Sequence, residues 1–265
     1  MAEKENPVLR FLYHTVIGRR ILWILVHPSV SVFVGKFMDS RLSRCLIRGF
    51  IKKNHIDVSE YQQEEYRCFN DFFCRHIRPE LRPADMEPEH LIAPCDGLLS
   101  VYRMEQERII PVKQSAYTLR ELVHSDELAK EFEDGWCLVY RLCVHHYHRY
   151  CYVDSGIKGE NVFLPGKLQT VRPIALRQKN VFCENSREYT VMETEHFGRI
   201  VQMEVGALLV GKIANHDGPG PVERGKEKGT FLYGGSTVIV LLKKDAVSLT
   251  PDEEEREVKL GEWIH

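Results

Sequence analysis

The sequence predicts an α+β fold in which amino-terminal helices precede a mainly antiparallel, β-rich domain. Residues 1–56 are apolar and basic, whereas short strand-like runs separated by glycines and charged turns follow His90. Between these two parts, prolines in residues 83–88 predict a linker. This order fits an antiparallel α+β fold better than a wound parallel sheet. We therefore expect a helical region over residues 1–83 and a β-rich domain over residues 84–265.

The amino-terminal apolar segment covers residues 8–37. Its longest stretch without a charged residue is 15 residues long (21–35), and Pro28 divides it. A helix that spans a membrane needs roughly 20 apolar residues, and no small-x-small cleavage site of a secretory signal follows. Short helices that lie in a membrane interface fit this pattern. The alternative is that these helices pack on the body of the protein itself.

The charge is unevenly placed along the chain. Residues 1–56 contain ten Lys and Arg side chains and three acidic ones, a net charge of +7, while the whole chain carries −2. The remaining residues therefore carry −9. A basic segment attached to an acidic body indicates an anionic partner, either a membrane surface or a nucleic acid.

The β-rich part is predicted from apolar runs between turn residues. Residues 54–82 are polar with a helical pattern, and one helix is expected over residues 119–132. We expect strands over residues 98–103, 109–112, 136–143, 189–193, 200–204, 207–213 and 238–242.

The eight cysteines show no Cys-x-x-Cys pair and no regular spacing. A chain of 265 residues does not need disulfides to fold, so free thiols in a reducing cytosol are expected. The same irregular spacing argues against a zinc site.

A small turn, Gly234-Gly235-Ser236-Thr237, stands directly before the apolar run of residues 238–242. Glycine at 235 has no Cβ, so its carbonyl stays approachable. If the Ser236 hydroxyl attacks that carbonyl, the peptide bond becomes an ester. Elimination across the serine would then leave a pyruvoyl group at a new amino terminus. The alternative is an ordinary turn at the entry to a strand.

Three other features could assist Ser236. Serine needs a base to take its proton, and a carboxylate often orients that base. Asp96 ends a turn before a strand, and His146 and His148 would share one face of an extended segment. Arg187 lies in a polar loop and suits a phosphate or carboxylate. The alternatives are a metal site or a solvated strand edge for the histidines, and a local turn role for Asp96.

Taken together, these motifs resemble the phosphatidylserine decarboxylase family. The matching segments occur in family order: Phe69-Asn70-Asp71-Phe72-Phe73, Ala93-Pro94-Cys95-Asp96-Gly97, Tyr147-His148-Arg149, Asn185-Ser186-Arg187, Val205-Gly206-Ala207 and Gly234-Gly235-Ser236-Thr237. The resemblance implies self-cleavage between Gly235 and Ser236 into a β chain of residues 1–235 and an α chain of residues 236–265 that stay associated. The Ser236 pyruvoyl group would be the covalent cofactor.

The resemblance also implies the reaction and its place. The pyruvoyl group would bind the amine of phosphatidylserine as a Schiff base and accept electrons while carbon dioxide leaves, giving phosphatidylethanolamine. We expect a peripheral enzyme on the cytoplasmic face of the cell membrane, with an anionic membrane surface and no nucleic acid as partner, and a homo-oligomer is possible. The alternatives are a pyruvoyl decarboxylase of another amino substrate and an unprocessed, inactive lipid-binding relative.

The sequence departs from the commonest family pattern near its histidines. Cys151 stands where many members have a second histidine, and His146 stands where they often have aspartate. The missing histidine is usually assigned as the self-cleavage base. We expect His148 to replace it, with His146 as the next candidate and Asp96 supporting the base. His146, Arg149 and Arg187 are the expected substrate-binding residues.

Overall fold

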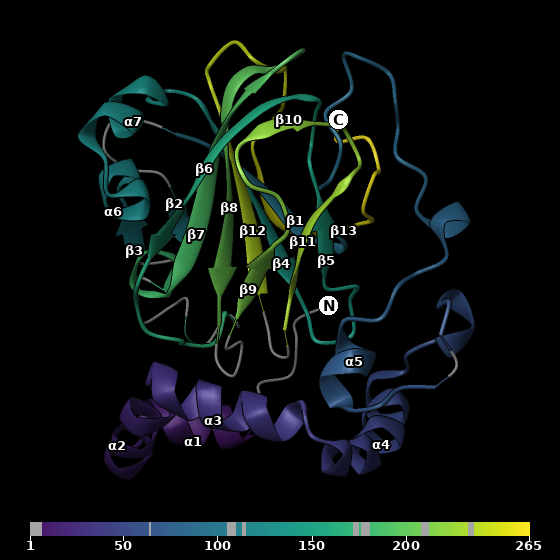
Figure 1. The fold of residues 1–265 in the computed structure, drawn as a ribbon. Coiled ribbons are helices and arrows are strands. Elements are labelled where there is room, and N and C mark those ends of the chain that lie inside the picture. Colours follow the sequence, from purple (N-terminus) through teal and green to yellow (C-terminus); the bar gives the residue numbers. More distant parts are fainter. Residues whose placement is uncertain are drawn as a thin grey trace.

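A large antiparallel sheet forms the centre of the molecule (Figure 1). The computed structural model describes residues 7–63, 65–104, 110–112, 115–171, 175, 181–207, 212–232 and 236–265. Within these residues the strands of the large sheet are, in spatial order, β10 (Gly220–Val222), β6 (Gly156–Leu164), β7 (Arg187–Thr194), β8 (Gly198–Gly206), β12 (Ser236–Leu242), β4 (Trp136–Leu142), β1 (Gly97–Arg103) and β13 (Asp252–Val258). The predicted α+β fold is confirmed.

Strand β12 lies in the middle of this sheet. It pairs with β8 on one side and with β4 on the other, and all seven of its residues are buried. A continuous run of β-branched and leucine side chains suits a strand that is covered on both faces. The core of the molecule therefore forms around the segment that follows the Gly234-Gly235-Ser236 turn.

A second, smaller sheet covers one face of the large one. Its strands are β5 (Arg149–Cys151), β11 (Glu227–Phe231) and β9 (Ile213–Asn215). Gln202 of β8 donates to the carbonyl of Cys151 in β5, at 2.9 Å, which joins the two layers. The short hairpin of β2 (Ile110–Val112) and β3 (Ser115–Tyr117) stands apart from both sheets.

Three short helices cover the other face: α6 (Leu119–Val123), α7 (Asp126–Glu131) and α9 (Val181–Glu184). The prediction of a single helix over residues 119–132 is wrong, because the chain leaves the helical conformation between α6 and α7. His124 adopts a left-handed conformation with φ 52° and ends α6. Ser125 then caps α7 by accepting from the Leu128 amide, so a new helix begins.

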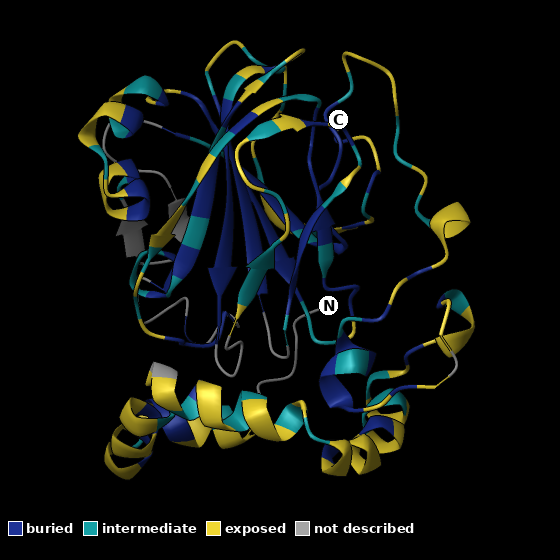
Figure 2. Ribbon diagram, viewed as in Figure 1, coloured by how far each residue is buried: buried dark blue, intermediate teal, exposed yellow. Residues whose placement is uncertain are grey.

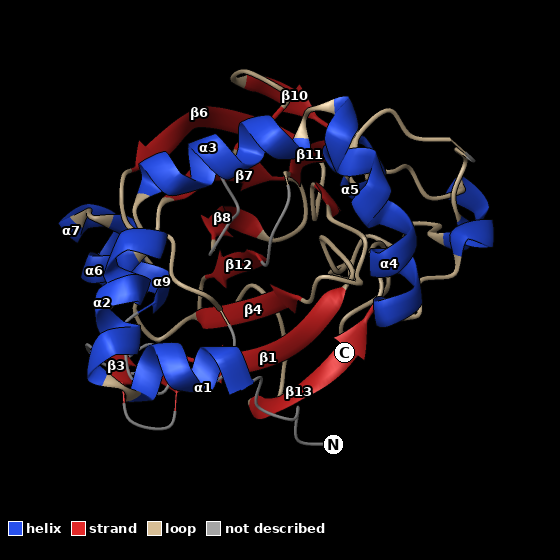
Figure 3. Ribbon diagram, turned by 90° about the horizontal axis from the view of Figure 1, so that it is seen from below, coloured by secondary structure: helices blue, strands red, loops and turns tan. Residues whose placement is uncertain are grey.

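The amino-terminal segment forms the predicted short helices: α1 (Pro7–His14), α2 (Val16–Leu25), α3 (Pro28–Met38) and α4 (Cys45–Asn54). Thr15 caps α2, and Pro28 occupies the first turn of α3, where its missing N–H costs nothing. Helices α1 to α3 lie beneath the end of the large sheet at which β8 ends and β12 begins (Figures 1 and 3). This arrangement places the apolar helices at the end of the sheet where β12 begins.

These helices are anchored to the body on one side and exposed on the other. Leu12, Tyr13, Leu22 and Val26 belong to the main hydrophobic core. The outward side of the layer is exposed (Figure 2) and includes other large apolar side chains. No single helix in the described part of the chain is long and apolar enough to cross a bilayer; α2 and α3 meet that length and composition only as a pair bent by 67°.

Residues 54–82 contain much less helix than the sequence predicts. Beyond the last residue of α4, the described residues of this range form only α5 (Phe69–Phe73) and the 3-10 turns η2 (Val58–Glu60) and η3 (Pro79–Leu81). An isolated bridge between Tyr61 and Ile77 ties the segment into a loop instead. Residues 83–88 are irregular, as expected, but whether residue 83 divides two domains stays a prediction.

The predicted strands lie within a few residues of β1, β2, β4, β7, β8 and β12. In the predicted strand of residues 207–213, Ala207 follows β8 and Ile213 begins β9, while residues 208–211 lie outside the described part.

Candidate active site

Ser236 is the first residue of β12 and lies opposite Leu142 of β4 and Gly206 of β8. Its side chain is fully buried, and its Oγ has no hydrogen-bond partner among the described residues. A buried hydroxyl without a partner costs free energy, so such groups are rare and often functional. Gly235, on the other side of the expected cleavage point, lies outside the described residues.

Asp96 lies immediately before β1, which pairs with β4. Its carboxylate accepts two hydrogen bonds from Arg82, from Nε to Oδ1 at 2.8 Å and from Nη2 to Oδ2 at 2.7 Å. The Leu260 amide also donates to Oδ1, at 2.9 Å. Asp96 is thus held rigidly by a bidentate ion pair. Among the described residues, Asp96 accepts hydrogen bonds from an arginine and a backbone amide. The sequence led us to expect that it would instead support a histidine base.

His146 lies in a turn, not in the extended segment considered from the sequence. The Cys143 amide donates to its Nδ1 at 3.0 Å, so the proton of the neutral ring is on Nε2. That Nε2 lies 4.0 Å from Oε1 of Glu257. Burial lowers the pKa of His146 to about 4, with a smaller contribution from His145. The acceptor nitrogen of His146 is therefore already occupied.

His148 has the opposite arrangement. Its Nδ1 is 2.9 Å from the His146 carbonyl oxygen, which can only accept, so Nδ1 carries the proton. Its Nε2 is then an acceptor, and it is buried without a partner among the described residues. The ring packs against Phe73, with centroids 4.2 Å apart. Burial lowers the pKa of His148 to about 3. Of the two histidines, only His148 has an open lone pair.

The backbone of His148 is attached to the strand that leads to Ser236. Its carbonyl oxygen accepts from the Phe231 amide at 3.0 Å and from Oγ1 of Thr230 at 3.1 Å. Phe231 ends β11 and precedes Ser236 by five residues. Five residues span at most about 18 Å, so His148 and Ser236 belong to the same region.

Arg149 and Arg187 have internal partners where the sequence led us to expect a ligand. Arg149 donates from Nε to the Cys74 carbonyl at 2.8 Å and from Nη1 to Oε1 of Glu227 at 2.6 Å. Arg187 is buried and, among the described residues, donates only to backbone carbonyls, those of Leu122, Cys183, Asn185 and Glu121. These contacts hold helices and loops in place, which is a structural role.

The Asn185-Ser186-Arg187 loop positions the strand beside Ser236. Asn185 donates from Nδ2 to the Gly206 carbonyl at 2.7 Å. The Gly206 amide in turn donates to the Ser186 carbonyl at 2.9 Å. Because Gly206 is the pairing partner of Ser236, this loop fixes the end of β8 against which β12 begins.

Two buried cations of this region were not predicted from the sequence. Arg75 is fully buried, donates to the Tyr61 hydroxyl at 3.0 Å and lies over the Tyr61 ring at 4.3 Å. Lys228 is fully buried and forms an ion pair with Glu204 at 2.6 Å. Glu204 immediately precedes the Val205-Gly206-Ala207 motif. This position is the sequence signal that could have pointed to Glu204 as a residue of the site.

Cys151, at the position of the usual second histidine, is a buried neutral thiol. Burial raises its pKa to about 12, so it is a poor proton acceptor. All eight cysteines are free, as expected. Among the residues that the structure describes, no group of three or more His, Cys, Asp or Glu side chains is arranged to hold a metal ion.

Comparison with known proteins identifies the family. The phosphatidylserine decarboxylase family model matches residues 69–265. The chain is 39% identical over 268 residues to phosphatidylserine decarboxylase proenzyme 2 of Clostridium acetobutylicum, covering 98% of this chain and 92% of that protein. It is also 39% identical over 259 residues to the phosphatidylserine decarboxylase proenzyme of Clostridium perfringens, covering 96% and 88%. The chain belongs to the phosphatidylserine decarboxylase family.

Proposed function

We propose that this chain is a phosphatidylserine decarboxylase proenzyme that cleaves itself between Gly235 and Ser236 and then converts phosphatidylserine to phosphatidylethanolamine. The observation that carries the proposal is the Ser236 hydroxyl, which is buried and without a partner among the described residues at the start of the central strand. Relatives over nearly the whole chain bear the name proenzyme, which supports a precursor that is cut.

His148 is the proposed base for the first step. Its Nε2 takes the Ser236 Oγ proton as Oγ bonds to the Gly235 carbonyl carbon. The carbon–nitrogen bond then breaks, and the proton passes to the departing nitrogen. An ester and a free amine result. The open lone pair of His148 fits this role, whereas the occupied Nδ1 of His146 does not.

The second stage forms the pyruvoyl group. Elimination across Ser236 releases Gly235 as a carboxylate, and water then replaces the nitrogen, which leaves as ammonia. The structure offers a suitable site, because the Ser236 side chain is enclosed and carries a polar atom that no described residue satisfies. The group would supply an electrophilic carbonyl that accepts electrons during loss of carbon dioxide.

The two chains would remain together after cleavage. The small chain, residues 236–265, contributes both β12 and β13 to the large sheet. Since β12 is buried completely between β8 and β4, its removal would expose the centre of the core. The new amino terminus is thereby fixed at the end of the sheet.

The layer of helices α1 to α3, at the end of the sheet where β12 begins, is the proposed membrane-binding surface. Trp23 and Phe33 are 74% and 76% exposed, and further exposed apolar residues of this layer are Phe11, Ile17, Ile21, Ile24, Val32 and Phe37. The basic side chains Arg10, Arg19, Arg20 and Lys36 lie on the same helices. Apolar side chains flanked by cations are typical of helices that lie in an anionic membrane interface. We therefore propose a peripheral enzyme on the cytoplasmic face of the cell membrane.

Binding to vesicles tests this surface. The double variant Trp23→Ser/Phe33→Ser should bind phosphatidylserine-containing vesicles at least about tenfold more weakly in co-sedimentation, since each side chain loses a buried apolar area. Phe163→Ser is the matched control, because Phe163 is also exposed, at 57%, but lies on β6. Equal binding by all three proteins would reject the helical layer as the membrane surface.

Intact mass and release of carbon dioxide test the function itself. The purified protein should consist of two chains, the smaller one beginning with a pyruvoyl group at position 236, and should release carbon dioxide from phosphatidylserine in vesicles. A single full-length chain would contradict self-cleavage. Two chains that release carbon dioxide from a soluble amino acid, and not from the lipid, would replace the substrate while keeping the chemistry.

A further inference from the structure

A buried ion pair lies on the same face of the sheet as Ser236. Glu204 of β8 and Lys228 of β11 are both fully buried, and Nζ of Lys228 is 2.6 Å from Oε2 of Glu204. The pair connects the large sheet with the small one. Taking two charges out of water is costly, and a structural pair normally satisfies every oxygen in return.

Strand register brings Glu204 next to Ser236. Gly206 is directly opposite Ser236, and Glu204 is the preceding residue of β8 on the same face. Diagonal neighbours of this kind have Cα atoms about 7–8 Å apart, which a glutamate side chain can bridge. Because Gly206 has no side chain, nothing from β8 stands between the carboxylate and Ser236.

The carboxylate of Glu204 is satisfied on one oxygen only. Oε2 accepts from Lys228 and also from Nδ2 of Asn215 at 3.2 Å. Oε1 is buried and has no partner among the described residues. The Ser236 Oγ is in the same state. Glu204 Oε1 and Ser236 Oγ are thus two unsatisfied polar atoms on the same face of the sheet, on diagonally neighbouring residues of β8 and β12. Such a pair indicates a reactive site rather than a purely structural one.

We propose that Glu204 is the base that removes the Cα proton of Ser236 when the ester is eliminated, an inference that rests on the proposed self-cleavage. Oε1 takes the proton, and the electron pair of the Cα–H bond becomes the Cα–Cβ double bond. The Cβ–Oγ bond breaks, and its electron pair leaves with the Gly235 carboxylate. No other reactant is required.

This step divides the work between two bases. The Oγ proton that His148 takes in the first step returns to the departing nitrogen, so that histidine cycles back to its neutral form. The Cα proton is far less acidic and needs an anionic acceptor. Burial raises the pKa of Glu204, which makes its carboxylate the stronger base of the two.

Several charged or titratable groups surround this carboxylate. Lys228 and Lys158 favour its charged form, and Glu188 opposes it. Among the described residues, Tyr150, Tyr152 and Cys95 also interact with it. Of these side chains, and among the described residues, only Lys228 donates a hydrogen bond directly to Glu204. A change at Lys228 should therefore shift the pH dependence of the elimination more than a change at any of the others.

The test uses the full chain made by cell-free synthesis and followed by intact mass. The Glu204→Gln variant should form the ester but convert it at least about 100-fold more slowly than the wild type, the usual loss for a missing general base. Hydroxylamine cleaves esters and spares amides, so it should split this variant into two chains. The smaller chain would then begin with an intact serine at position 236.

Three other variants separate chemistry from folding. Asp154→Asn neutralises another buried carboxylate and should form the pyruvoyl chain at the wild-type rate. Glu204→Gln/Lys228→Gln removes both charges, leaves neither unpaired, and should also accumulate the ester. Lys228→Gln alone raises the Glu204 pKa further, so the pH profile of the elimination should move to higher pH, which a merely structural role would not cause.

Each alternative result has a distinct meaning. Formation of the pyruvoyl chain by Glu204→Gln at the wild-type rate would overturn the proposal. So would a folded Glu204→Gln chain, with a wild-type-like circular dichroism spectrum, that hydroxylamine cannot split, because the block would then precede the ester. If Glu204→Gln fails to fold, the double variant decides by the same two criteria, and Glu204→Asp should regain part of the rate. A wild-type chain that stays uncut would instead reject the proposed self-cleavage.

Discussion

Two buried carboxylates, Asp154 near the start of strand β8 and Glu204 near its end, each form an ion pair, but their oxygens are satisfied to different degrees. Asp154, which lies between β5 and β6, pairs with Arg224 at 3.0 Å and accepts from His196, two residues before β8 begins. Near the end of β8, Glu204 pairs with Lys228 at 2.6 Å. All four side chains are almost completely excluded from solvent. The two pairs therefore differ in hydrogen bonding and not in burial.

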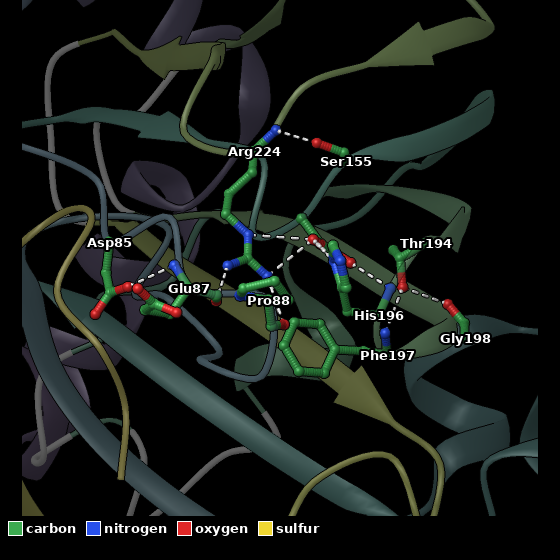
Figure 4. Close-up of polar contacts among 10 residues, drawn as sticks. Asp85, Glu87, Pro88, Ser155, Thr194, His196, Phe197, Gly198 and Arg224 are labelled. Atoms are coloured by element: carbon green, nitrogen blue, oxygen red, sulfur yellow. Dashed lines mark hydrogen bonds and ion pairs between the residues drawn. The ribbon is translucent and has the colours of Figure 1, made fainter.

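The Asp154 carboxylate uses both of its oxygens within the cluster around Arg224, His196 and Phe197 that Figure 4 draws. Oδ1 accepts from Arg224 and from Nδ1 of His196, and Oδ2 accepts from the His196 amide at 2.9 Å. Arg224 also donates to the carbonyls of Glu87 and Pro88, and lies over the Phe197 ring. This cluster ties the loop around residue 87 to the strands and leaves no acceptor open on Asp154.

The end that contains Ser236 leaves several groups unsatisfied. Ser236 Oγ, His148 Nε2 and Glu204 Oε1 are all buried without partners among the described residues. Apolar side chains of similar volume at these positions would avoid the free-energy cost of burying unsatisfied polar atoms. A buried charge alone therefore does not indicate a reactive site. A buried group that also has an acceptor atom without a hydrogen-bond partner does.

The largest expected effect comes from removing the open acceptor of His148. His148→Ala should slow cleavage of the precursor by about 100- to 10,000-fold, whereas His146→Ala should slow it less than about tenfold, because the Nδ1 of His146 is already occupied. The rates can be followed by intact mass after cell-free synthesis. Added imidazole should restore part of the rate in His148→Ala, which distinguishes loss of a base from loss of the fold.

Normal cleavage by His148→Ala would contradict this role, since the open lone pair of His148 would then take no part in self-cleavage. An equal loss in both variants would remove the distinction between the two histidines.

A change at Asp154 should lower the free energy of unfolding and leave the rate of pyruvoyl formation unchanged. Asp154→Asn leaves the buried Arg224 cation without its counter-charge, so the free energy of unfolding should fall by about 3–5 kcal/mol. Urea unfolding in the uncut Ser236→Ala background measures this change without interference from cleavage. Slower pyruvoyl formation in a folded Asp154→Asn protein would mean that the two ends are coupled.

A smaller effect is expected from acid. Burial lowers the pKa of His146 to about 4 and that of His148 to about 3, while both are near 6.5 in the unfolded chain. Below pH 6.5 the unfolded state binds more protons, so stability is complete above that pH and falls as the pH decreases toward the folded values.

Between pH 6.5 and 5, each histidine should remove about 2 kcal/mol of stability, at 1.36 kcal/mol per pH unit. Urea unfolding of Ser236→Ala at the two pH values measures the loss, and His146→Gln should flatten the dependence. No change in the free energy of unfolding over this range would contradict the burial of these rings.

The sequence was informative where structure is set locally. The run of residues 238–242 is apolar throughout, and it forms the buried strand β12. Pro28 divides the apolar amino-terminal segment, and it also separates α2 from α3. By contrast β13 was missed, because its exposed acidic side chains, typical of a protected sheet edge, hide its strand pattern.

The parts of the site set by long-range contacts could not be predicted. Lys228 and Glu204 are 24 residues apart, and only the packing of the small sheet on the large one makes them neighbours. Arg187 was expected to bind substrate because the sequence shows its guanidinium. It does not show the four backbone carbonyls that accept hydrogen bonds from that group. The open Nε2 of His148 likewise depends on which carbonyl its Nδ1 meets.

The central position of β12 affects the lifetime of the protein. Before cleavage, folding is a reaction of one chain and does not depend on concentration. Once the chain is cut before Ser236 as we propose, the same strand order would have to be rebuilt from two separate molecules, one of them only 30 residues long (236–265). Refolding would then depend on protein concentration. The mature enzyme would therefore be protected by its rate of unfolding, and a molecule that unfolds once would seldom recover.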